Sequence, residues 1–236
     1  MITKKYFVGF LIITGIIAGL WILSKTFLTL NFRHKKVISF LHEPEKFRES
    51  IMPALMQCDT APFIMPTSGM IGFIWGDSFR PGHRHQGIDI FGGSEGGKTP
   101  VYAAYDGYLT RLDSWISTVV IRIPHDPLDK DRQIWIYYTH MADAEGNSLI
   151  VDSFLPDTTE VFVQAGTLLG YQGNFSGMPD SPTGIHLHFS IIKEDGEGRY
   201  LNELKFKNTI DPSPYFGMEL NARRNLVDIP LCGLSK

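Results

Sequence analysis

The residues in this sequence whose types and spacing could do chemistry are histidines and an aspartate, grouped in three short motifs. The first motif is HQGID at residues 85–89. Side chains alternate between the two faces of a strand, so an extended chain would place His85 and Asp89 on one face and Ile88 on the other. The intervening glycine leaves space over the backbone between an imidazole and a carboxylate, which is room for a metal ion. The plainer alternative is a turn histidine beside a solvated aspartate.

The second motif, HLHF at residues 186–189, contains two imidazoles two residues apart. In a strand, His186 and His188 share one face, while the leucine and the phenylalanine point into the core. Two adjacent imidazolium groups would repel each other, which favours neutral rings that bind a metal or carry protons. The third motif is the histidine that ends the apolar run IWIYYTH at residues 134–140. By itself His140 is an ordinary surface residue.

The three motifs are more informative together than apart. One carboxylate and two imidazoles supply three protein ligands, the usual number at a catalytic zinc, and leave the fourth position open. His85 and Asp89 can supply two ligands, and either His186 or His188 the third. The remaining histidine of that pair and His140 would then lie beside the ion as proton carriers.

The elements that must position these residues are predicted to be strands. Between Gly69 and Lys193 the sequence consists of short runs rich in β-branched and aromatic residues, including GIDIF, VYAAY, TVVIRI, IWIYYTH, TLLGYQG and HLHFSII. Turn-forming residues separate the runs, and no helical periodicity is sustained. The predicted fold class is all-β, an antiparallel β-sheet sandwich or a partly closed barrel.

An N-terminal transmembrane helix is expected before this body. Residues 6–23 are 18 consecutive residues without a charge, preceded by Lys4 and Lys5 and followed by Lys25. A helix of that length spans about 27 Å, enough for a slightly thin bilayer core. The following residues offer no small-x-small cleavage site, so we expect a retained anchor. The distribution of basic residues around the span favours a cytoplasmic body, but this rule is weak for long domains.

Net charge and cysteine content exclude several classes of protein. Residues 37–236 carry 16 basic and 25 acidic side chains, a net charge of −9. Such a body lacks the basic surface that a phosphate backbone requires, so we expect no nucleic-acid partner. The two cysteines, Cys58 and Cys232, are too few for a zinc finger. They form either one disulfide, in an oxidising compartment, or two buried thiols.

Taken together, the motifs resemble those of the lysostaphin/LytM-type zinc metalloendopeptidases, which cut peptide bonds in bacterial cell walls. The matching stretches lie in order between Gly69 and Phe216. They are the HxGxD motif, KTPVYAAYDGYL for the family's "gtPVyAaadG-V", YTHM for YAHL, GTLLGYQG, SPTGIHLHFSI for TGPHLHFEI, and IDPSPYF for NPxxYL.

By position, the resemblance implies roles for five residues. It implies one zinc ion per chain with three ligands, His85, Asp89 and His188. It implies two catalytic histidines beside the attacking water, His140 and His186, without saying which of them takes the proton. His83 offers a second imidazole two residues before His85, but only His85 completes the HxGxD motif. Because all five positions are filled, catalysis is favoured over a scaffold role.

The resemblance also implies an organisation and a location. We expect an anchor at residues 1–30, a stalk or linker at 31–67, a LytM-type metallopeptidase domain at 68–217 and a tail at 218–236. The expected protein is a membrane-anchored zinc metalloendopeptidase that hydrolyses peptide bonds in peptidoglycan stems or cross-bridges. Its catalytic domain would be extracytoplasmic and face the cell wall, which overrides the count of basic residues around the span.

Three alternatives remain at this point. The same fold could serve as a non-catalytic LytM-like module that binds or activates another wall hydrolase or a divisome partner. A carrier domain of the lipoyl or biotin type is suggested by the turn VQAGTLLGYQG, but the sequence lacks a lysine at a carrier-type hairpin tip. A reduced Cys58, placed just before the domain, could reach the open metal position and keep the enzyme latent.

Overall fold

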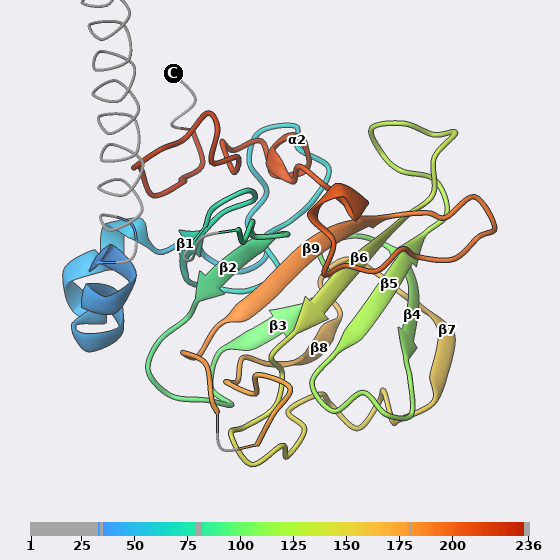
Figure 1. The fold of residues 1–236 in the computed structure, drawn as a ribbon, viewed down its shortest axis with the longest axis horizontal. Coiled ribbons are helices and arrows are strands. Elements are labelled where there is room, and N and C mark those ends of the chain that lie inside the picture. The colour runs from blue at the N-terminus through green and yellow to red at the C-terminus, as the bar shows by residue number, and fades with distance from the viewer. Residues whose placement is uncertain (1–32, 34, 79–81, 180, 234–236) are drawn as a thin grey trace, which may run out of the picture.

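The computed structural model describes residues 33, 35–78, 82–179 and 181–233 (Figure 1). The expected transmembrane segment at residues 6–23 lies outside these residues. Within them, no helix is both long and apolar enough to cross a membrane. The elements are η1 (Pro44–Ser50), β1 (Met70–Phe73), β2 (Ile88–Phe91), β3 (Pro100–Tyr102), β4 (Gly107–Arg111), β5 (Val119–Ile123), β6 (Ile134–Thr139), β7 (Thr158–Val163), β8 (Leu168–Tyr171), β9 (Leu187–Lys193), η2 (Phe206–Asn208), β10 (Thr209–Ile210) and α2 (Ser213–Phe216).

The strands form two antiparallel sheets. The larger sheet has the order β1-β2-β9-β6-β5-β4-β7, with β10 paired to β9, and the smaller sheet pairs β3 with β8. The prediction of an all-β fold is therefore confirmed. The larger sheet has free edges at β1 and β7, so the partly closed arrangement that the sequence allowed does not form in the described part of the chain.

One hydrophobic core lies between the two sheets. Strand alternation sends Ile88 of β2 and the pair Leu187 and Phe189 of β9 to the same side, where all three are fully buried. Burial of Leu187 and Phe189 was predicted from the sequence. Val101 of β3 and Leu169 of β8 belong to the same cluster, so the small sheet covers this face of the large one. On the opposite face, pairing of β2, β9 and β6 brings Asp89, His188 and Thr139 side by side.

The segments expected to be a stalk and a tail are packed into this body. Phe63 and Met65, from the expected stalk, are fully buried in the main core. Residues 35–42 are helical and pack Phe40 against the outer side of β1 and β2. From the expected tail, Leu220 is also fully buried in the main core. Removing these large apolar side chains from water stabilises the packed arrangement of both segments relative to an extended one.

A disulfide joins the two segments. Cys58 and Cys232 are bonded across 174 residues of sequence, with their Cα atoms 5.4 Å apart. Of the two alternatives that the sequence left open, the disulfide is therefore the one that forms. The hypothesis that Cys58 is a free thiol reaching the metal is wrong, because its sulfur is used in this bond.

Candidate metal centre and active site

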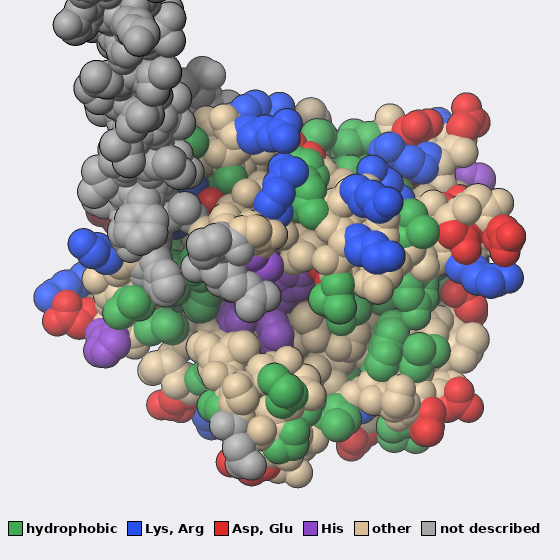
Figure 2. Space-filling view, in the orientation of Figure 1, with side chains coloured by type: hydrophobic (Ala, Val, Ile, Leu, Met, Phe, Trp, Pro, Cys, Tyr) green, Lys and Arg blue, Asp and Glu red, His purple; other side chains and the backbone are tan. Residues whose placement is uncertain are grey.

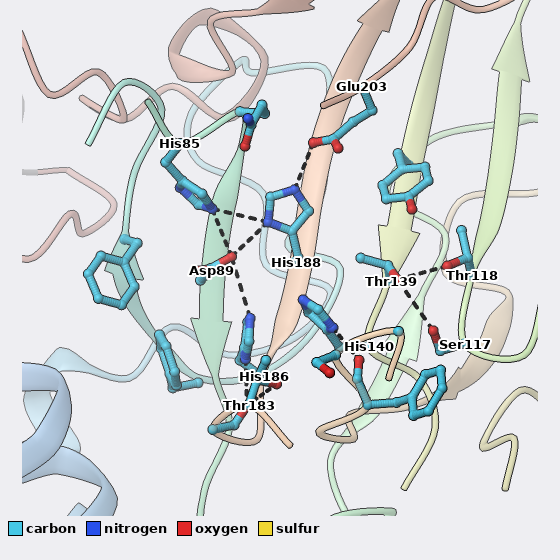
Figure 3. A pocket seen from close by; sticks show the side chains of 18 of the residues that line it. His85, Asp89, Ser117, Thr118, Thr139, His140, Thr183, His186, His188 and Glu203 are labelled. Carbon is cyan, nitrogen blue, oxygen red and sulfur yellow. Dashed lines mark hydrogen bonds and ion pairs between the residues drawn. The ribbon is translucent and has the colours of Figure 1, made fainter. Parts of the chain in front are cut away.

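Three candidate ligands converge on one point at the polar face of β2 and β9 (Figure 3). Antiparallel pairing sets Asp89 of β2 directly opposite His188 of β9, and Asp89 Oδ1 lies 2.8 Å from His188 Nδ1. His85, which precedes β2, brings its Nε2 to 3.0 Å from Asp89 Oδ1 and 3.1 Å from His188 Nδ1. The chain thus brings together, from two distant motifs, the three residues that the sequence proposed as ligands.

Gly87 makes this convergence possible, for a reason that differs from the predicted one. A Cβ atom at position 87 would lie only 2.0 Å from the carbonyl oxygen of Phe189. The space over this glycine is therefore filled by the backbone of β9, and it is not the room for an ion that the sequence suggested. Strand β2 begins at Ile88, so simple alternation does not extend back to His85, which reaches the site from the preceding loop.

The three atoms fit a metal ion. Ligand atoms bound tetrahedrally at about 2.0–2.1 Å from an ion lie about 3.3 Å from one another. The observed separations of 2.8–3.1 Å are close to that value. The other ring nitrogens are already engaged: His85 Nδ1 lies 3.2 Å from the carbonyl oxygen of Ile74, and His188 Nε2 lies 3.1 Å from Glu203 Oε1. Each ring therefore has its remaining nitrogen directed at the common point.

The electrostatics of the cluster also favour a cation. Burial alone would lower the pKa of His188, but hydrogen bonds to Asp89 and Glu203 outweigh it and raise the pKa to about 10. Burial would raise the pKa of Asp89, yet the surrounding histidines hold it well below the usual range. Two buried carboxylates thus flank His188 and bind a proton there. A metal ion at the common point would displace that proton, because imidazole binds metals in its neutral form.

His186 and His140 lie beside the three candidate ligands. His186 Nδ1 is 2.6 Å from the carbonyl oxygen of Gly184, and His140 Nδ1 is 2.7 Å from that of Phe175. A carbonyl accepts only from N–H, so in the neutral rings each Nδ1 carries the hydrogen and each Nε2 is an acceptor. His186 Nε2 lies 3.6 Å from Asp89 Oδ1. The ring centroids of His186 and His140 are 4.5 Å apart.

Both histidines are held neutral by their surroundings. Burial, reinforced by the neighbouring imidazoles, lowers the pKa of His140 to about 3, and burial lowers that of His186. His140 follows the last residue of β6 with a φ of 72°, in the left-handed region that most residues avoid. This backbone turn directs the ring into the site, and such outliers are common at functional positions. Each ring is therefore neutral, with an unprotonated Nε2 next to the candidate metal position.

A cavity of about 630 Å³ opens over the five residues (Figure 2). One wall is apolar and is formed by the 35–42 helix together with Phe73 and Phe91. The other wall carries hydroxyl groups, which come from Ser117, Thr118, Tyr137 and Thr139. His83, the alternative ligand weighed from the sequence, lines this cavity and is not one of the three converging residues.

Sequence reasoning missed Glu203 and the hydroxyl wall. Glu203 follows His188 by 15 residues in a polar loop and belongs to no motif. Thr118 Oγ1 and Thr139 Oγ1 are 2.7 Å apart only because β5 and β6 pair. No local pattern marks these residues, since their role depends on contacts between segments.

No protein-family model and no curated protein matches the sequence. Several solved structures are similar. The catalytic domain of the antimicrobial peptidase lysostaphin from Staphylococcus simulans has a TM-score of 0.41 and 20% identity, over 62% of this chain and 90% of that one. A variant of the catalytic domain of the prophage-encoded protein EnpA from Enterococcus faecalis has a TM-score of 0.37 and 21% identity, over 64% and 97%.

A third similar structure is a putative glycyl-glycine endopeptidase from Ruminococcus gnavus, with a TM-score of 0.37 and 22% identity. The match covers 55% of this chain and 44% of that one, so this chain spans less than half of its length. The similar structures belong to the lysostaphin/LytM group, which the motifs of this sequence resemble. At these TM-scores the likeness is partial.

Proposed function

We propose that this protein is a zinc metalloendopeptidase that hydrolyses peptide bonds in peptidoglycan stems or cross-bridges. The observation that carries the proposal is the convergence of His85, Asp89 and His188, with His140 and His186 beside them. Two imidazoles and one carboxylate are a typical ligand set for catalytic zinc, which keeps a position open for chemistry. Two neutral imidazoles next to that position supply the acid and base groups that peptide hydrolysis needs.

A zinc ion held by the three ligands would act as a Lewis acid on a peptide carbonyl and on water. The chain's own residues do the rest. His140 and His186 present unprotonated Nε2 atoms, so one of them takes a proton from the attacking water and returns it to the leaving amine. The other takes up a proton from solvent through the open cavity and then donates its Nε2–H to the oxygen that becomes negative during attack. Their hydrogen bonds to Phe175 and Gly184 keep both rings oriented throughout.

The cavity supports an extended peptide substrate. The hydroxyl groups of Thr118 and Thr139 can bond to the amide groups of an extended backbone. The opposite wall, with Phe73 and Phe91, suits small apolar side chains such as alanine. Peptidoglycan stems and cross-bridges combine both features.

We further propose that the catalytic body lies outside the cytoplasm and is tethered to the membrane by residues 6–23. The Cys58–Cys232 disulfide supports this location, because such bonds persist in oxidising compartments and are rare in the cytosol. The uncharged run of 18 residues in the sequence supports the tether. A wall location would bring the site to its substrate and to a wall hydrolase or divisome component as its partner.

The test uses the full chain purified in mild detergent. Zinc content is measured by mass spectrometry of the metal, and fragments released from purified sacculi are identified by liquid chromatography and mass spectrometry. We expect about one zinc per chain, and we expect His188→Ala to lose both zinc and hydrolysis. His140→Asn and His186→Asn should keep zinc and lose activity by about 10²- to 10⁴-fold, the usual contribution of a general acid or base.

His125→Asn is the matched control, because His125 is an exposed histidine on the β5–β6 loop that bonds to the carbonyl of Lys130. It should leave zinc content and activity unchanged. Zinc retention without release of any fragment from sacculi of several cross-link types would refute the enzymatic proposal. Activation of a separate hydrolase in the same assay would then favour the non-catalytic module.

A further inference from the structure

We propose that Glu203 is a positioning residue, whose carboxylate accepts the Nε2–H of His188 and so presents His188 Nδ1 to the metal. The inference deepens the proposed function, since it assigns a residue outside the sequence motifs to the same site. It concerns metal binding and is therefore testable apart from hydrolysis.

The contact between the two side chains is direct and buried. Glu203 Oε1 points at His188 Nε2 (Figure 3) and lies 3.1 Å from it. Both side chains are only 10% exposed. On the other side of the same ring, Asp89 Oδ1 lies 2.8 Å from Nδ1. A neutral imidazole has a single N–H, and a carboxylate at Nε2 selects the form in which Nε2 carries it. The lone pair of Nδ1 is then directed at the point shared with His85 and Asp89.

The loop that carries Glu203 is fixed from several sides. The side-chain oxygen of Asn202 accepts from the backbone N–H of Leu204 (2.9 Å), and its carbonyl accepts from the side chain of Asn208 (2.8 Å). The side chain of Gln86 donates to the carbonyl oxygen of Leu204 (3.1 Å). Because Gln86 lies inside the HQGID motif, this bond ties the loop to the segment that carries His85. Glu203 is thus held at a fixed position relative to His85 and His188.

Charge gives a second reason for a carboxylate at this place. With neutral imidazoles, Asp89 alone would leave one positive charge of a divalent ion without a counter-charge in a buried site. Glu203 supplies it, and a buried charge without compensation is costly. In the resembled motif HLHFEI the strand itself carries a glutamate where this chain has Ser190. Ser190 is uncharged, and the carboxylate that contacts His188 Nε2 is that of Glu203, from the loop after β9.

The test measures zinc affinity of the full chain in detergent by competition with a chromophoric chelator. Glu203→Leu should weaken zinc binding about 10- to 100-fold, the usual cost of losing a residue that orients a metal-bound histidine. Glu203→Gln should fall between Leu and wild type, because the amide oxygen still accepts the Nε2–H but carries no charge. Glu197→Gln is the control, an exposed glutamate on the loop after β9, and should leave affinity unchanged.

Two further measurements separate positioning from simple destabilisation. Thermal unfolding of the metal-free proteins shows whether each variant folds, and the visible spectrum of the cobalt-substituted protein reports ligand geometry. We expect the cobalt spectrum of Glu203→Gln to shift relative to wild type. Zinc affinity of Glu203→Leu within twofold of wild type would overturn the proposal. Wild type that binds zinc but cuts no wall substrate would refute the proposed function and leave the role of Glu203 intact.

Discussion

Replacing Gly87 by alanine should open the metal site without touching any candidate ligand. The new Cβ atom would lie 2.0 Å from the Phe189 carbonyl oxygen and 2.8 Å from Ser190 Cβ. A carbon–oxygen contact needs about 3.3 Å, so the two chain segments must separate by about 1 Å. The obstructing atom is backbone and cannot rotate away. The pair Asp89 and His188, next in the same register, must then move apart with the strands.

The expected magnitude follows from this displacement. Metal sites tolerate ligand distances within about 0.2 Å, so a 1 Å shift should remove three-point coordination. We expect zinc affinity to fall at least 100-fold, which corresponds to about 2.7 kcal/mol. Overpacking between β2 and β9 should add about 1–3 kcal/mol of destabilisation to the metal-free protein.

Zinc competition and urea unfolding of the purified full chain check both numbers. Gly96→Ala is the matched control, because a Cβ atom there meets nothing within 4 Å and its backbone needs no positive φ. It should bind zinc and unfold like the wild type. A Gly87→Ala protein with wild-type zinc affinity would refute the reasoning, since the close approach of the two segments would then not determine the site.

Three further predictions follow from contacts of the described residues. Zinc affinity should rise with pH below about 10, by up to tenfold per pH unit. The reason is that the metal must displace the proton that Asp89 and Glu203 hold on His188. Calorimetric titrations that give the same zinc affinity at pH 6 and pH 8 would contradict this prediction. Replacing Cys58 and Cys232 by serine should lower the free energy of unfolding by up to about 5 kcal/mol, because the disulfide closes a loop of 174 residues. Equal urea midpoints of the wild type with and without reductant would show that the disulfide does not stabilise the fold. Tyr138→Phe should lower the free energy of unfolding by about 1–3 kcal/mol and leave zinc affinity unchanged. The substitution removes the hydroxyl that accepts from the buried backbone N–H of Ala104 (2.8 Å) and leaves that N–H without a partner. Thermal unfolding and zinc competition measure the two effects.

The sequence by itself determined the local chemistry of this protein. Alternation in HLHF predicted that Leu187 and Phe189 are buried while His186 and His188 share the other face, and the structure has this arrangement. Short β-branched runs between turn residues predicted the all-β class. These inferences succeed because strand periodicity and ligand chemistry are properties of neighbouring residues, which a sequence displays directly.

Only the tertiary structure decided what these local patterns do together. Asp89 meets His188 across 99 residues because β2 and β9 pair in one register, and a slip by one residue would turn one of them away. Gly87 is needed because the backbone of β9 packs directly against it. The sequence had suggested that the missing side chain leaves space for a metal ion. Glu203 and the Cys58–Cys232 bond depend on where loops return to the body. Such contacts are set by packing between distant segments, and no period or spacing along the chain encodes them.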